Sequence, residues 1–193
     1  AVKADSPYKT IEELVAAAKE KGNLKASTNG NKASNHTAAQ LLAKSAGFKY
    51  KAIPYGGTAD QLLALRQGEV DFTCAKVADV AKLVKGDKPE LRVLAVFNTK
   101  RDPELPNVPT LGEKGLYPEW YGSARALVAP KGTKPEVIQY YVEAFKKTMQ
   151  DPAVIEAHKK AGMALDFKDN KELGDLIKAQ DKFARDVVND LYQ

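Results

Sequence analysis

The residues best suited to chemistry in this sequence gather in STNGNKASNH, residues 27–36. Nearly every side chain there carries a hydrogen-bond donor, and the stretch leads into an apolar-periodic helix. A strand-to-helix loop needs only about 2–6 residues, so this one is longer than its connection requires. Because the first turn of a helix has unpaired N–H groups and a partial positive charge, the pattern is typical of a loop that binds a carboxylate or phosphate through backbone amides. A well-capped loop without a ligand uses the same residue types.

Gly30 lets this loop bend sharply because it has no Cβ atom. We expect Ser34 or Asn35 to cap the following helix and His36 to lie in its first turn. The two common nucleotide signatures, G-x-x-x-x-G-K-[ST] and G-x-G-x-x-G, are absent from the sequence. The loop therefore predicts an anion site of another kind.

A second polar turn, PYGGTAD at 54–60, places two glycines and Thr58 directly before another predicted helix. In open parallel sheets, ligands lie off the carboxyl ends of the strands. Both turns follow predicted strands. Together they predict one wall of a ligand cleft.

Strands and helices of about ten residues alternate along the chain, which predicts an α/β protein with a mostly parallel sheet. We expect strands at 24–27, 48–53, 69–74, 91–97, 123–129 and 163–167. We expect helices at 10–22, from the polar loop to 47, and at 59–67, 77–84, 110–115, 133–149, 152–162 and 171–190. Three T-x-x-E capping boxes and an Asp-Pro pair predict helix starts at Thr10 with Glu13, Thr110 with Glu113, Thr133 with Glu136, and Asp151 with Pro152.

Composition excludes several classes of function. The 193 residues carry a net charge of +5, and no basic run reaches five residues, so nothing indicates nucleic-acid binding. The one cysteine, Cys74, permits no intrachain disulfide and no zinc site, and its alternation with Val70 and Phe72 predicts a buried strand position. No apolar run reaches the roughly 18 residues of a membrane span, and the first ten residues lack the pattern of a signal peptide.

The order of these motifs resembles that of the solute-binding proteins of tripartite tricarboxylate transporters, the TctC or Bug family. The matching pieces are STNGN…H, IPYGGTADQLLALRQGEVD, LRVLAV…KRDPELPNVPTLGEKG and ALVAPKGTKPEV, and they cover almost the whole chain. The resemblance implies a fold similar to the type II periplasmic binding proteins, with a mono-, di- or tricarboxylate held between two lobes. It also implies a periplasmic location, membrane transporter subunits as partners, and neither catalysis, cofactor nor metal.

The resemblance assigns ligand contacts to three segments of the chain. It implicates the polar loop, the PYGG turn and the residue after the next strand, namely Ser27, Thr28, Asn29, Gly30, Asn31, Ala33, Ser34, His36, Tyr55, Gly56, Gly57, Thr58 and Ala75. The chain departs from the family pattern at Ser27, at Lys32 and around Ala75, which leaves the distal part of the pocket and the identity of the acid open. Lys32 or Lys76 either adds a charge to the pocket or is solvated.

The resemblance also predicts how the chain is divided. Residues 4–118 would form the second ligand-binding lobe, 122–193 the mostly helical C-terminal part of the first lobe, and 98–122 a surface loop and hinge region. Family members begin with further strands of the first lobe before SPYKT. We therefore expect a fragment without the N-terminal part of that lobe, completed by the missing segment in trans, or a short form that dimerises.

Two other functions use similar residues. An effector-sensing module of a regulator has the same two-lobed fold, and a small α/β hydrolase would use His36 with a serine, although no G-x-S-x-G elbow is present.

Asp71 is expected to be structural, and Tyr121 to pack at the hinge or line the pocket. Arg125, in an apolar segment, is expected to be buried and paired across the lobes or with the ligand.

Overall fold

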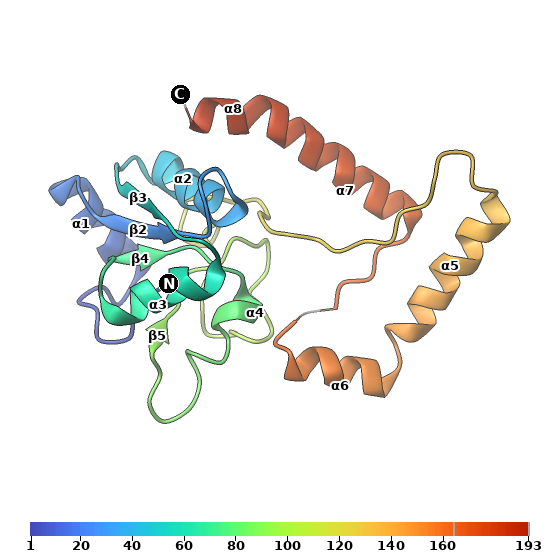
Figure 1. Ribbon diagram of the computed structural model, residues 1–193, viewed down its shortest axis with the longest axis horizontal. Helices are drawn as coiled ribbons and strands as arrows, with labels where there is room; N and C mark the ends of the chain where they lie inside the picture. The colour runs from blue at the N-terminus through green and yellow to red at the C-terminus, as the bar shows by residue number, and fades with distance from the viewer. Residues whose placement is uncertain (164, 193) are drawn as a thin grey trace. The chain divides into compact units, whose positions relative to one another are not determined.

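The computed structural model describes residues 1–163 and 165–192 (Figure 1). The chain divides into two compact units, Ala1–Ser123 and Ala124–Gln193. The strands, all in the first unit, are β1 Val2–Lys3, β2 Lys25–Thr28, β3 Lys51–Pro54, β4 Phe72–Thr73 and β5 Leu91–Arg92. The helices are α1 Ile11–Lys21, α2 Ser34–Ala46, α3 Thr58–Gln67, α4 Val77–Val80, α5 Pro135–Thr148, α6 Pro152–Lys160, α7 Asn170–Phe183 and α8 Asn189–Leu191. The expected α/β class is confirmed.

The central sheet of the first unit is parallel, as the alternation of elements predicts. Its strands lie in the order β3-β2-β4 (Figure 1), with Thr28 opposite Pro54 and Ser27 opposite Thr73. Ala1 exchanges two backbone hydrogen bonds with Thr73, at 2.8 and 2.9 Å. Since β1 also pairs antiparallel with β5, the beginning of the chain lies between β4 and β5.

Side chains of the sheet divide between two apolar clusters. Ala26 and Phe72 belong to the cluster that contains the buried faces of α1 and α2. The second cluster contains Leu62 and Leu65 of α3 with Val80 and Leu91. Because successive strand residues point to opposite faces, Ser27 and Thr73 face the side of α3, where Gln61 of α3 contacts Ser27 O and Thr73 Oγ1.

Several predicted helix ends are confirmed. Thr10 Oγ1 accepts the N–H of Glu13 at 3.2 Å, and α1 ends at Gly22, whose φ of 65° few other residues adopt. The carboxylate of Asp151 accepts the N–H of Ala153 at the start of α6. Asp71 is structural, because its carboxylate accepts the N–H of Lys25 at 2.7 Å.

Of the predicted capping boxes, the one at Thr133 is wrong and the one at Thr110 is incomplete. Thr133 donates its hydroxyl to Pro130 O, so α5 begins one residue later, with Lys134 at the N-cap. Thr110 Oγ1 does accept the N–H of Glu113. The expected helix nevertheless does not form, and the segment to Gly115 is a series of turns. The carboxylate of Glu113 pairs with Arg101 and does not return to the start of the segment to complete the capping box.

The prediction of strands at 123–129 and 163–167 is wrong for the described residues, and Ala164 lies outside them. No described strand lies beside either segment, and an isolated strand has no ladder partner. Arg125 is consequently exposed rather than buried, with Nη1 3.5 Å from the sulfur of Met163. The predicted strand 91–97 is also shorter than expected, because after Arg92 only Val96 makes a bridge, to Thr110.

The second unit is helical, as its residues predict. The final helix continues from α7 through a π-helical segment, Ala184–Val188, into α8. Helix α5 carries a stripe of large apolar side chains that is open to solvent: the exposed side chains include Val137, Tyr140, Tyr141 and Phe145, of which Tyr140 is 69% exposed. Within the described residues this stripe has no cover.

Candidate functional site

The polar loop and the PYGG turn both leave the sheet at its carboxyl edge. Strands β2, β3 and β4 run parallel and end in register, so the segments 29–33, 55–57 and 74–76 leave the sheet at one edge. The N–H of Tyr55 donates to Thr28 O at 2.9 Å, which continues the pairing of β2 and β3 by one residue. This bond holds the beginnings of the first two segments side by side.

The polar loop is held by its own side chains. Asn29 Oδ1 accepts the N–H of Asn35 at 3.3 Å, and Thr28 Oγ1 donates to Gly30 O at 3.3 Å. Ala33 occupies the N-cap without a side-chain bond. The prediction that Ser34 or Asn35 caps α2 is therefore wrong, because Asn29 satisfies the helix end from six residues away.

Two residues in the loop have positive φ angles. Gly30 has φ 130°, a conformation that side chains rarely adopt, and Lys32 has φ 57°. The strain at Lys32 is offset locally, because its N–H donates to Nδ1 of His36 at 2.9 Å. Gly30 therefore permits one bend of the loop, and the hydrogen bond to His36 stabilises the other bend at Lys32.

His36 lies in the first turn of α2, as expected, and is buried. Burial disfavours the imidazolium form and lowers the pKa of His36. Because Nδ1 accepts the Lys32 N–H, the proton of the neutral ring lies on Nε2. This arrangement gives His36 a role in shaping the loop, and it withholds Nδ1 from a serine nucleophile.

The second turn presents backbone more than side chains. Gly57 is the N-cap of α3 in an extended conformation. The hydroxyl of Tyr55 donates to Glu69 at 3.1 Å; partial burial and then this contact raise the pKa of Tyr55. Within the described residues, the N–H groups of Ser34 and Thr58 have no protein acceptor, as is usual for the first residue of a helix.

Two helix N-termini with free amides at one sheet edge are an arrangement that holds a carboxylate. The comparison with known proteins gives the context. The model of the "Tripartite tricarboxylate transporter family receptor" matches residues 1–191. The chain belongs to this family.

Solved structures and curated relatives agree with that assignment. The structure of a TctC solute-binding protein from Polaromonas is 28% identical, with a TM-score of 0.86 over 98% of this chain and 64% of that one. MatC from Rhodopseudomonas palustris, solved with bound malate, is 20% identical and shares the fold, with a TM-score of 0.71 over 100% of this chain and 65% of that one. A UPF0065 protein of Cupriavidus necator is 38% identical over 152 residues, 78% of this chain and 45% of the relative. The chain spans about half the length of the curated relatives it matches.

The structure brings most of the expected contact residues to the same edge of the sheet, at different depths. Asn31 and Gly56 are exposed, whereas Ser27, Thr28 and His36 are buried. The others are intermediate in exposure: Asn29, Gly30, Ala33, Ser34, Tyr55, Gly57, Thr58 and Ala75. Ser27 Oγ is buried without a hydrogen-bond partner among the described residues. Lys32 and Lys76 are exposed on the loops that flank this edge.

Sequence reasoning missed a buried polar cluster directly beneath the loops. Gln61 is fully buried and contacts Asn35, Thr73 and the carbonyls of Ser27 and Cys74. The signal for it was present. Gln61 lies four residues before Leu65 on the buried stripe of α3, and a polar residue on such a stripe requires hydrogen-bond partners.

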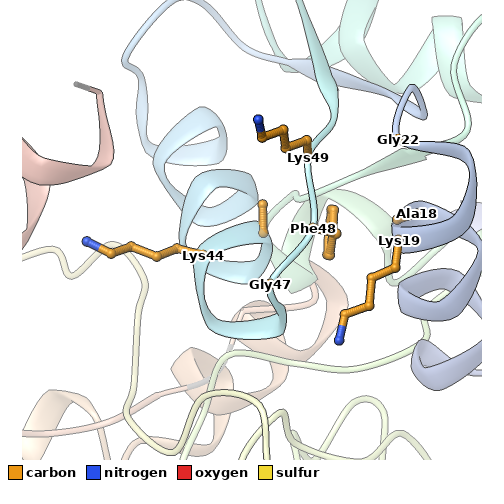
Figure 2. Close-up of a pocket in the computed structure, with 8 residues that line it drawn as sticks. Ala18, Lys19, Gly22, Lys44, Gly47, Phe48 and Lys49 are labelled. Carbon is orange, nitrogen blue, oxygen red and sulfur yellow. The ribbon is translucent and has the colours of Figure 1, made fainter.

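A surface hollow of about 410 Å³ lies elsewhere, at the C-terminal turns of α1 and α2. These helices lead into the amino ends of β2 and β3, so the hollow lies at the opposite edge of the sheet from the loops. Figure 2 shows that Lys19, Lys44 and Lys49 extend around it in different directions. Lys19 and Lys44 are in the last helical turns, where a cation complements the helix dipole. None of the predicted ligand-contact residues lines this hollow.

Neither a metal site nor a membrane helix is found in the part of the chain that the structure describes. No group of three or more His, Cys, Asp or Glu side chains there could hold a metal ion. No helix in the same residues is long and apolar enough to cross a membrane. The loops at the sheet edge present backbone amides and neutral polar side chains, with Lys32 and Lys76 exposed beside them.

Proposed function

We propose that this chain is part of a periplasmic solute-binding protein that captures a small mono-, di- or tricarboxylate and delivers it to the membrane subunits of a tripartite transporter. One observation carries the proposal: the N-termini of α2 and α3 and their loops meet at one edge of a parallel sheet. Membership of the receptor family supports it, as does the malate bound by the R. palustris protein with the same fold.

In the proposed site the ligand carboxylate accepts hydrogen bonds from the start of α2 and from loop 29–33. The partly exposed residues Gly30, Ala33 and Ser34 would contact it directly. Ser27, Thr28 and His36 are buried and would support the loop from below. Gly56, Gly57 and Thr58 would form the neighbouring wall, with Asn29, Asn31, Tyr55 and Ala75 around it.

We also propose the division of the chain into parts of two lobes. Residues 4–118 correspond to the second lobe, 122–193 to the C-terminal part of the first, and 98–122 to the surface loop and hinge between them. The open stripe of α5 supports this, since Tyr140 and Phe145 are the kind of side chains that a lobe buries. Closure of the two lobes around the acid would then present a joint surface to the transporter.

The test is isothermal titration calorimetry of the full-length gene product with malate, and with malamide as a neutral control of the same shape. We expect heat of binding for the diacid and none for malamide, because helix N-termini favour negative charge. Equal binding of both would contradict the role given to the amides. Failure of malate, succinate and citrate alike would overturn the assignment of a small carboxylic acid as ligand.

Native mass spectrometry of the chain as purified tests how the site is completed. A second polypeptide or a dimer, carrying a small acid that denaturation releases, would support completion in trans. A bare monomer of 21.0 kDa would contradict it, and the binding assay would then be confined to the full-length product.

A further inference from the structure

A single buried side chain connects α3, which follows the PYGG turn, with α2, which follows the polar loop. Gln61 lies in the second turn of α3 and has no exposed surface. Its Nε2 group lies 2.5 Å from Thr73 Oγ1, 2.8 Å from Cys74 O and 3.3 Å from Ser27 O. These atoms belong to the carboxyl ends of β2 and β4, so the amide group is anchored to the sheet edge from which the loops leave.

The other end of the same amide reaches α2. Gln61 Oε1 accepts a hydrogen bond from Asn35 Nδ2 at 2.8 Å, and Asn35 is itself buried. The backbone N–H of Asn35 in turn donates to Asn29 Oδ1 in the polar loop. A continuous chain of hydrogen bonds therefore runs from α3, through Asn35, into loop 29–33.

Packing of the core does not require a polar residue at the position of Gln61. Its neighbours on the helix stripe, Leu62 and Leu65, pack in an apolar cluster. A buried amide carries a desolvation cost that only well-made hydrogen bonds offset. Here the bonds are made to the carboxyl ends of β2 and β4 and to Asn35 of α2, which favours a role in geometry over a role in packing alone.

We infer that Gln61 is a positioning residue, which holds the N-termini of α2 and α3 at a fixed separation so that both present their amides to one ligand. This inference rests on the proposed function of the two loops. It adds a residue that touches no ligand but sets the geometry of those that do. Thr73 shares the anchor to the sheet and takes no part in the link to α2.

The test compares Gln61→Met with Thr73→Val in the full-length gene product. Methionine keeps the length of the side chain and removes both ends of the amide. Valine keeps the shape of threonine and leaves the contact of Gln61 with Asn35 intact. We expect Gln61→Met to weaken the binding of malate at least about tenfold, and Thr73→Val to change it by less than about twofold, when both are measured well below the melting temperatures.

Hydrogen exchange of the ligand-free proteins gives a readout that is independent of binding. We expect the amides of residues 34–37 to exchange faster in Gln61→Met than in Thr73→Val at equal global stability. Asn35→Leu severs the same link from α2 and serves if Gln61→Met does not fold. Unchanged exchange at 34–37 in Gln61→Met, or in Asn35→Leu if that variant replaces it, would overturn the inference. If wild-type protein binds no carboxylic acid, the proposed function fails, and the exchange data still decide whether Gln61 positions the loop.

Discussion

The phenolic hydroxyl of Tyr121 donates a hydrogen bond to the backbone carbonyl of Ser34, 3.2 Å away and 87 residues earlier in the chain. The ring of Tyr121 also packs edge-on against Phe97, with the centroids 6.1 Å apart. The segment that ends the first unit is thereby attached to the first residue of α2. The structure shows Tyr121 packed beside the polar loop, and its expected place at the hinge or in the wall of the pocket stays a prediction.

Removing this hydroxyl should loosen that attachment. We expect Tyr121→Phe to lower the free energy of unfolding by about 1 kcal/mol, because the ring stays and one hydrogen bond is lost. Tyr140→Phe is the matched control, since Tyr140 is 69% exposed and its hydroxyl is solvated. Urea denaturation followed by circular dichroism measures both, and equal midpoints for the two variants would contradict the prediction.

Gly30 allows a direct test of the loop. A β-branched residue is strained at φ 130°, so Gly30→Val should change the path of the loop and weaken malate binding by at least about tenfold, with little loss of overall fold. Gly86→Val is the control, because Gly86 also has a positive φ, of 89°, and lies outside the predicted ligand-contact segments. Calorimetry on both variants decides: similar affinities would show that the loop does not carry the ligand.

The burial of His36 predicts a pH dependence of stability. Its pKa is lowered in the folded protein, so below about pH 6.5 the unfolded chain takes up a proton more readily than the folded one. The contribution of His36 to stability is therefore complete above that pH and is lost as the pH falls through the lowered pKa. Protonation at Nδ1 would also break the bond from the Lys32 N–H.

His36→Asn separates this effect from the titration of carboxylates, since an asparagine oxygen can still accept from Lys32. We expect the difference in unfolding free energy between wild type and the variant to be constant above about pH 7 and to shift in favour of the variant towards pH 5. Chemical denaturation at several pH values measures it. A pH-independent difference would mean that His36 is as accessible to protons in the native state as in the unfolded chain.

Cys74 follows β4 and is only partly buried, so the predicted buried strand position is wrong, but the residue should still be a poor nucleophile in the native protein. Burial raises the pKa of its thiol to about 11, so the reactive thiolate is scarce at pH 8. We expect a disulfide reagent to label the folded protein at least about 30-fold more slowly than the same protein in 6 M guanidinium, in line with the ordinary thiol pKa of about 8.5. Native labelling at the denatured rate would show that the thiol is open to solvent.

Local sequence signals predicted much of the first unit. Gly22, Gly47 and Gly68 marked the ends of helices, and each has a positive φ at that place. The alternation of strands and helices predicted the parallel order, and with it the meeting of the polar loop and the PYGG turn at one edge. These features depend on residues close together in the chain, which is why periodicity and capping rules could find them.

Features that depend on distant partners were not predicted. The segment 123–129 has the composition of a strand but no described strand beside it, so its composition alone led to a wrong prediction of a strand. Asn29 takes the capping role from Ser34 and Asn35 because the loop folds back on itself. The link between Gln61 and Asn35 joins positions 26 residues apart, and only the packing of α2 and α3 against one sheet brings them together.

The pairing of β1 has a consequence for how the polypeptide reaches this fold during translation. Val2 and Lys3 can form their strand pairing only after Arg92 and Leu91, their partners, have left the ribosome. At about 5–20 residues per second, the first strand therefore waits several seconds with its apolar face uncovered. During that interval β1 keeps unpaired backbone groups on the side that β5 later occupies, and a nascent chain in this state is a natural substrate for chaperones.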